Sequence, residues 1–396
     1  MLTARQAIYD DQLTVVAYEL LLRAEQGEAE AIGADPTRNA ALFGSRLRDL
    51  IGDHPVHLEV SADFLASSHP LPLHPQRVVL GLAAGTLAGP EVADAARRRK
   101  KEGYRLAIDL DAAEDRATVV ALADVVRLDV GTLGEFATDA LVRTLAPLGA
   151  RLMARGVESH DSFEALRALE IDLFQGYFFA TPELVPGQGM PVSSMSTLRL
   201  LAAMNAPGVD LRQLERLISL DVGLSYSLLR SINSPYFGLR REITSIRQCL
   251  VLVGLDNIRR WATLLALAEV EDKPHELMVT ALLRARLAEL LAPTFGESDP
   301  DALFIVGLFS VLDALMDAPM AEVLEALPLA EAVAAALLRR EGTKGQALSC
   351  VIACERGDVI EARNGPAADA LLGDLYLEAA AWATQAGEGL RPSVPA

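Results

Sequence analysis

The fold of this chain is decided by two apolar stretches, VVAYELLLR at residues 15–23 and LFQGYF at residues 173–178. Further short apolar runs recur between them, at 56–60, 77–82, 106–110, 125–130 and 151–157. Charged, Ala-rich segments of the kind that form helices separate these runs. Continuous apolar strands that alternate with helices are typical of a parallel sheet buried on both faces. Residues from about 14 to 179 are therefore expected to form an α/β domain.

The pattern changes in residues 183–194, where Pro, Gly and Ser accumulate and the strand signals stop. Beyond this segment the apolar residues recur at helical spacing, for example at Leu211, Leu214 and Ile218. The sequence predicts an α/β domain at residues 1–188, an all-helical domain at 189–385 and a frayed tail at 386–396.

Composition limits the protein class. A length of 396 residues favours two domains. No apolar run reaches the ~18 residues needed to span a bilayer, and the N-terminus lacks a secretory pattern. Three cysteines, Cys249, Cys350 and Cys354, form neither a CxxC pair nor an even set, which favours buried thiols in a cytoplasmic protein. A net charge of −18 disfavours nucleic acid as a partner.

The first half resembles an EAL domain, the family named for a Glu-Ala-Leu motif whose members hydrolyse cyclic di-GMP. Glu19 lies at the motif Glu, in Glu-Leu-Leu, and Arg23 lies at the Arg that contacts ligand phosphate. The resemblance implies a barrel similar to a TIM barrel, with acidic strand ends that bind two divalent cations, Mg or Mn. About 185 residues fall short of a full barrel, so a trimmed barrel is expected, distorted or open.

Several positions keep a polar group where the resemblance implies a ligand. These are Glu59, which replaces an Asn, and Asp109, Asp129, Glu158 and Gln175. Together with Glu19 and Arg23 they are the candidate nucleotide-binding residues.

Other positions lose the group that the resemblance implies. Gly81 and Leu110 replace carboxylates, Arg155 replaces a metal-associated Glu, and Arg127 replaces a Lys. Arg cannot shed a proton at accessible pH, so Arg127 cannot take a proton-transfer role. We therefore expect no catalytic residues, no enzymatic activity and no cofactor, with Mg or Mn relevant only to a residual phosphodiesterase activity.

Two interpretations of the new arginines stay open. Arg155, and with it Arg127, could place guanidinium charge where metal is implied and pair with Glu19, Asp109 or Asp129. Alternatively, these residues form separate ion pairs at strand ends.

The second half contains SLDVGLSYSLLRSINSPYFG at residues 219–238, which resembles an HDOD domain. Its motif residues are Asn233, Ser234, Pro235, Phe237 and Gly238, and they are interpreted as architecture that ends one helix and caps the next. The HDOD fold is similar to the HD phosphohydrolases without their metal residues. Ser310 and Val311 lie where a His-Asp pair would be, so no metal centre is expected here.

Nearly the whole chain thus resembles the EAL-HDOD two-domain architecture. The leading hypothesis is a non-catalytic adaptor that acts through protein–protein contacts in bacterial signalling, with motility among the processes that the resemblance implies. One alternative is a receptor that binds cyclic di-GMP without cutting it, and another is a weak phosphodiesterase. Partner identity and a homodimeric state stay open.

Overall fold

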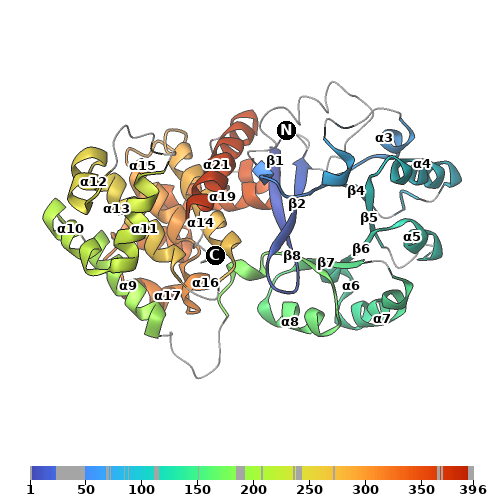
Figure 1. The fold of residues 1–396 in the computed structure, drawn as a ribbon, viewed down its shortest axis with the longest axis horizontal. Coiled ribbons are helices and arrows are strands. Elements are labelled where there is room, and N and C mark those ends of the chain that lie inside the picture. The colour runs from blue at the N-terminus through green and yellow to red at the C-terminus, as the bar shows by residue number, and fades with distance from the viewer. Residues whose placement is uncertain are drawn as a thin grey trace. The chain divides into compact units, whose positions relative to one another are not determined.

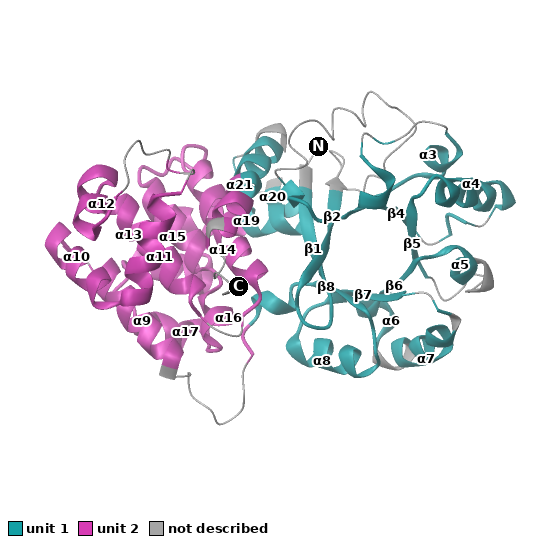
Figure 2. Ribbon diagram, viewed as in Figure 1, with its two compact units in different colours: residues 1–181, 350–381 teal, residues 182–349, 382–396 magenta. Residues whose placement is uncertain are grey.

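The computed structural model describes residues 2–23, 50–67, 71, 73–83, 85–87, 89–110, 116–149, 151–183, 192–206, 208–234, 237, 243–270, 273–363, 366 and 369–390 (Figure 1). The chain divides into two compact units (Figure 2). Unit 1 comprises residues 1–181 and 350–381, and unit 2 comprises residues 182–349 and 382–396.

Unit 1 contains a closed eight-stranded barrel in which neighbouring strands follow chain order. The strands are β1 (Leu2–Tyr9), β2 (Val15–Arg23), β3 (Val56–Glu59), β4 (Val78–Leu82), β5 (Arg105–Asp109), β6 (Val125–Asp129), β7 (Arg151–Val157) and β8 (Leu173–Gly176). The strands from β2 to β8 pair in parallel, which confirms the predicted sheet. β1 was not included in that prediction, and it pairs antiparallel with both β2 and β8. This strand closes the ring, so of the two expected forms, distorted or open, the open one does not occur.

Helices surround the barrel on its outer side (Figure 1). They are α3 (Ala62–Ala66), α4 (Pro90–Lys101), α5 (Arg116–Leu122), α6 (Val130–Leu133), α7 (Glu135–Leu145) and α8 (His160–Ala168). Local sequence sets their starts. Ser61 and Ser159 cap α3 and α8 through their hydroxyl oxygens, and Pro90 opens α4, where a missing N–H costs nothing.

The interior of the barrel is built in layers, because side chains two residues apart on a strand point the same way. One apolar layer consists of Ile8, Ala17, Val79, Ala107, Val125, Met153 and Leu173. Two residues away on the same strands lie Gln6, Glu19, Gly81, Asp109, Arg127, Arg155 and Gln175. We call these seven residues, with Glu59 at the end of β3, the polar layer.

Unit 2 is helical, as predicted. Its helices are α9 (Val192–Asn205), α10 (Leu211–Leu220), α11 (Val222–Ile232), α12 (Ile246–Val253), α13 (Leu255–Ala268), α14 (His275–Leu291), α15 (Pro300–Phe309), α16 (Leu312–Met316), α17 (Met320–Glu325) and α18 (Glu331–Arg339). α14 and α15 pack at very short range, because a Cβ at Gly307 would lie only 2.4 Å from the Arg284 carbonyl oxygen. Three more helices complete the chain: α19 (Gly342–Arg356), α20 (Val359–Arg363) and α21 (Asp369–Leu390).

The units differ from the predicted boundaries at the end of the chain. Residues 350–381 belong to the barrel unit rather than to the helical one. The Tyr376 hydroxyl accepts a hydrogen bond from the Arg5 amide on β1 at 3.1 Å, and the Tyr177 hydroxyl donates to the Glu355 carbonyl at 2.9 Å. Both contacts join residues more than 170 positions apart, which no local pattern indicates.

The predicted tail is also shorter than expected. α21 continues to Leu390, and both Ala386 and Leu390 are buried, so residues 386–390 are not frayed. Residues 391–396 lie outside the described part of the chain. No described helix combines the length and apolarity that a membrane crossing requires.

Candidate functional site

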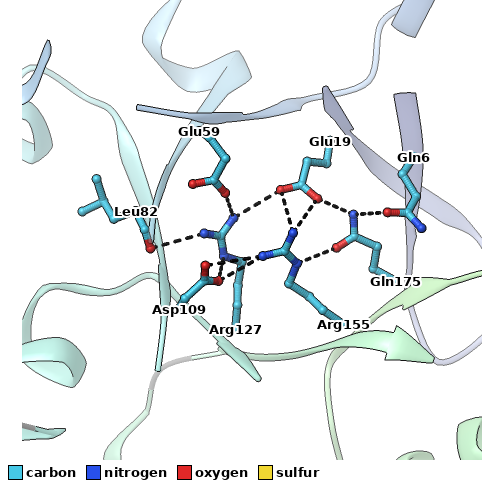
Figure 3. Close-up of polar contacts among 8 residues, drawn as sticks. All are labelled: Gln6, Glu19, Glu59, Leu82, Asp109, Arg127, Arg155 and Gln175. Atoms are coloured by element: carbon cyan, nitrogen blue, oxygen red, sulfur yellow. Dashed lines mark hydrogen bonds and ion pairs between the residues drawn. The ribbon is translucent and has the colours of Figure 1, made fainter. Parts of the chain in front are cut away.

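The polar layer lies toward the carboxyl ends of the parallel barrel strands, where barrels of this type place their sites. Figure 3 shows its charged and amide side chains pointing toward one another. The strands fix this convergence, because Asp109 is paired in register with Arg127, and Arg155 with Gln175. The site is therefore assembled from residues more than 150 positions apart in the sequence.

Arg127 is the centre of the layer, and its side chain is 0% exposed. Its Nε lies 2.6 Å from Asp109 Oδ1. Its Nη1 forms ion pairs with Glu59 Oε1 and, at 3.4 Å, with Glu19 Oε1. Its Nη2 donates to the Leu82 carbonyl oxygen at 3.3 Å. One buried guanidinium thus joins three carboxylates.

Arg155 holds the same cluster from the solvent side, with a side chain that is 27% exposed. Its Nη2 lies 3.3 Å from Glu19 Oε2, and its Nη1 lies 3.2 Å from Asp109 Oδ1. Its Nε donates to Gln175 Oε1 at 3.1 Å. The Gln175 amide in turn donates to Glu19 and, at 2.9 Å, to Gln6 Oε1. The two arginines therefore share Glu19 and Asp109 between them.

These contacts set the protonation states. Burial alone would raise the pKa of Glu19, but Arg155, Arg127 and the hydrogen bond from Gln175 together lower it. Burial raises the pKa of Glu59 despite its contact with Arg127. The three carboxylates raise the pKa of Arg127 against the effect of burial. Burial lowers the pKa of His57, next to Glu19 across β2 and β3, to about 3.

Gly81 supplies the space in which this cluster fits. A Cβ at this position would lie 2.5 Å from Glu59 Oε1 and 2.8 Å from Arg127 Nη1. Real side chains do not tolerate such distances, so the ends of the Glu59 and Arg127 side chains could keep these positions only if residue 81 has no Cβ.

The structure separates several candidate residues from this cluster. Asp129 is exposed, and its Oδ1 accepts from the Thr132 amide at 3.0 Å as the cap of α6. Glu158 is exposed beyond β7, and Leu110 is buried. Arg23 ends β2, but its side chain lies outside the described residues. The suggested pairing of an arginine with Asp129 does not occur in the structure, because this carboxylate caps a helix instead.

Three groups of the site were missed by sequence reasoning. Gln6 lies on β1, His57 lies two residues before Glu59, and Leu82 contributes only a carbonyl oxygen. The even spacing from His57 to Glu59 could have indicated the histidine, since both side chains point to one side of the strand. No sequence signal marks a carbonyl oxygen.

The described residues of the HDOD motif make contacts within unit 2. Asn233 caps the end of α11, and its side chain exchanges two hydrogen bonds of 2.8 Å with the backbone of Ile243. Ser234 is the next residue, and the Phe237 ring packs 5.2 Å from Trp261. Pro235 and Gly238 lie outside the described residues.

The polar layer does not fit the pair of divalent cations that the EAL resemblance implies. Each of its three carboxylates already contacts a guanidinium, so a dication would meet positive charge where it needs free oxygen ligands. Gly81 itself offers no side-chain ligand, and a Cβ there would already meet Glu59 and Arg127. Among the residues that the structure describes, no group of three or more His, Cys, Asp or Glu side chains is arranged to hold a metal ion.

Family models match both halves of the chain. The EAL domain model matches residues 60–182, and the HDOD domain model matches residues 190–342. The EAL match begins after Glu19 and Glu59, so the place of these two residues in the site rests on the barrel itself.

Two relatives match almost the full length. Cyclic di-GMP phosphodiesterase CdgJ of Vibrio cholerae is 30% identical over 371 residues, which cover 90% of this chain and 85% of the relative. Uncharacterized protein YuxH of Bacillus subtilis is 27% identical over 402 residues, which cover 96% of this chain and 97% of the relative.

Solved structures of EAL proteins match less than half of the chain. The Klebsiella pneumoniae BlrP1 complex with calcium and cyclic di-GMP is 20% identical with a TM-score of 0.35, covering 45% of this chain and 54% of that chain. The Bacillus subtilis YkuI protein, with an EAL domain, is 18% identical with a TM-score of 0.36, covering 44% of this chain and 54% of that chain.

Proposed function

Because this chain belongs to the family of proteins that join an EAL domain to an HDOD domain, we propose that it is a non-catalytic regulatory protein that acts through protein–protein contacts in bacterial signalling. The observation that carries this proposal is the pair of guanidinium groups inside the carboxylate cluster of the barrel. The side chains of Glu19, Glu59 and Asp109 contact Arg127 and Arg155 rather than presenting free oxygens.

Electrostatics supports the loss of two-metal hydrolysis. Two unit charges 4 Å apart interact by about 4 kcal/mol at an effective dielectric constant of about 20, so one guanidinium at that distance repels a dication by about 8 kcal/mol and offsets the attraction of one carboxylate. Hydrolysis by metal-activated water also needs a group that handles protons. Arg127, at the position of the implied Lys, cannot do so.

The activity in the name of the relative CdgJ argues against a non-catalytic protein. That relative is named a cyclic di-GMP phosphodiesterase, so hydrolysis of the same nucleotide is the outcome to test first. Calorimetry of the full chain with cyclic di-GMP, with and without Mg²⁺ or Mn²⁺, should be combined with analysis of the nucleotide. The proposal predicts that no linear dinucleotide forms. Its appearance at a rate above that of metal alone would falsify the proposal.

A receptor for intact cyclic di-GMP is the second candidate. One observation favours it: Arg155 and Asp109 retain side-chain exposures of 27% and 26% at the mouth of the barrel, so a guanidinium is open to a phosphate from solvent. In the same experiment, heat of binding without a cleaved product would indicate the receptor.

The role of Arg155 can be tested separately with Arg155→Glu. We expect this variant to bind Mn²⁺ more tightly than the wild type and to gain thermal stability when the ion is added, because one repulsive guanidinium is exchanged for a carboxylate. Arg167→Glu is a matched control, since Arg167 is half-exposed and pairs with Glu164 on α8, away from the cluster. Unchanged stability together with unchanged Mn²⁺ affinity in Arg155→Glu would show that Arg155 does not stand in for metal.

A further inference from the structure

Unit 2 contains an open pocket that the barrel chemistry does not involve. It has a volume of about 270 Å³ and lies where α13, α15 and α18 begin. Drug-sized ligands occupy pockets of roughly 300 to 1,000 Å³. A pocket of this size, open to solvent, suits the side chain of a docked segment better than a complete small ligand.

One wall of the pocket is apolar. It is formed by Ile305 of α15, by Pro328 and Leu329, and by Val333 of α18. Val333 is buried, Ile305 and Leu329 are half-buried, and Pro328 is exposed. The wall is therefore reachable from solvent, and an apolar side chain placed there would remove water from it.

The other wall is charged, and its arginines are already paired. Arg260 Nη1 lies 2.9 Å from Glu289 Oε1, its Nη2 pairs with Asp301, and its guanidinium lies 4.8 Å from the centre of the Phe304 ring. Arg259 Nη2 donates to the backbone of unit 2, at the Val209 carbonyl oxygen. An incoming anion would thus meet guanidinium groups that already have partners.

The carboxylates of the rim are more available. The side chains of Asp256 and Asp301 are 70% and 55% exposed, and Asp299 lies beside them as the cap of α15. Asp256 pairs with Arg259 at 3.4 Å and Asp301 pairs with Arg260, but a carboxylate has about four lone-pair positions, so one such contact leaves acceptor capacity free. Three acidic and two basic side chains line the pocket, on a chain whose net charge is −18. The rim therefore favours a cation.

We propose that this pocket binds a basic peptide segment of a protein partner, with one apolar side chain against Ile305 and Val333 and flanking Lys or Arg side chains at the acidic rim. The inference rests on the proposed function, because it names a partner chemistry for the protein contacts. At protein interfaces a few side chains that fill well-packed pockets supply most of the binding energy.

The test is a methyl NMR titration of the full chain with the capped peptide Lys-Leu-Lys. Saturable shifts are expected at the methyl groups of Ile305, Leu329 and Val333, and they should weaken as salt is added. The capped peptide Glu-Leu-Glu carries the same apolar side chain and should bind at least about fivefold more weakly. The absence of saturable shifts, or equal binding of the two peptides, would overturn the proposal.

A charge variant adds a matched control. Asp256→Asn should weaken Lys-Leu-Lys binding about two- to fivefold. Asp94→Asn should leave it unchanged, because Asp94 has a similar exposure and also pairs with an Arg three residues away, but lies on α4 in unit 1. Equal effects of the two variants would refute a local role of the rim.

The result of the peptide titration does not depend on whether the barrel hydrolyses cyclic di-GMP. Hydrolysis of cyclic di-GMP would refute the proposed function and would not alter the peptide titration. A missing peptide response together with intact nucleotide would refute only the pocket.

Discussion

Replacing Arg127 by Met tests the central ion cluster of the barrel. The substitution keeps an unbranched side chain of similar reach and removes the charge that Glu19, Glu59 and Asp109 share. Breaking a buried pair by removing one partner typically costs about 3 to 5 kcal/mol, because an uncompensated charge stays buried. A unit of roughly 200 residues loses about 2 to 4 °C in Tm per kcal/mol, so Tm of the barrel should fall by about 6 to 20 °C.

The loss of stability in Arg127→Met should depend on pH in a definite direction. In the wild type the pKa of Glu19 is lowered, so its contribution to stability is present above the unfolded pKa of about 4.3 and is lost as pH falls through the folded value. Without Arg127, burial is opposed by fewer contacts, and the pKa of Glu19 rises. A raised carboxyl pKa costs stability mainly at higher pH. The deficit of Arg127→Met should therefore be largest near neutral pH and shrink as pH falls below about 5.

Calorimetry measures the unfolding transitions of the two units, and tryptophan fluorescence shows which transition belongs to which unit. Both tryptophans, Trp261 and Trp382, belong to unit 2, so their emission reports the helical unit and serves as an internal reference. Arg143→Met is the control, because Arg143 is exposed and pairs with Asp139 on the same helix, α7; no measurable change is expected. If the free energy of unfolding of the barrel in Arg127→Met lies within about 1 kcal/mol of the wild-type value, the reasoning that three carboxylates share this guanidinium is refuted. A loss of stability that grows on acidification would also refute it.

Three further outcomes are expected from the packing and the pKa values. Gly81→Ala should destabilise the barrel by about 1 to 3 kcal/mol in urea unfolding, because its Cβ would meet Glu59 at 2.5 Å; wild-type stability would contradict this. Gly307→Ala should destabilise unit 2 by a similar amount or more, since its Cβ would meet the Arg284 backbone, and the tryptophan signal should report the loss. The His57 imidazole resonances should not shift between pH 8 and 5, because its pKa is about 3, and stability should fall as pH drops below about 6.5 while the unfolded imidazole gains a proton. A titration of His57 near pH 6 would show that the ring is hydrated.

The layered interior of the barrel could be predicted from sequence period alone. Glu19 and Asp109 each lie two residues beyond an apolar position, so they point into the same barrel as Ala17 and Ala107. β1 is different, because its polar residues have partners that only the tertiary structure supplies. Arg5 lies 4.6 Å from the centre of the Tyr18 ring, and its amide bonds to Tyr376. A strand that depends on such distant partners has no local apolar run to reveal it.

The choice between a shared cluster and separate ion pairs could not be made from the sequence. Asp109 and Asp129 both end parallel strands, and both are candidates by position. α6 begins directly after Asp129, and the Thr132 amide donates a hydrogen bond to the Asp129 carboxylate. Among the described residues no backbone amide caps onto Asp109 in this way, and its carboxylate forms ion pairs with Arg127 and Arg155.

Gly81 and Arg127 are neighbours in one packing arrangement. A side chain at residue 81 would require the space that Glu59 and Arg127 now fill, so the ends of these two side chains would have to move to admit it. Loss of ligands alone would leave buried acids unpaired, which costs several kcal/mol for each ion. Three carboxylates with two arginines leave a net charge of only −1 in the cluster. Within the closed barrel, Arg127 and Arg155 of the chain itself supply positive charge to Glu19, Glu59 and Asp109, so these acids have partners that do not depend on any ligand.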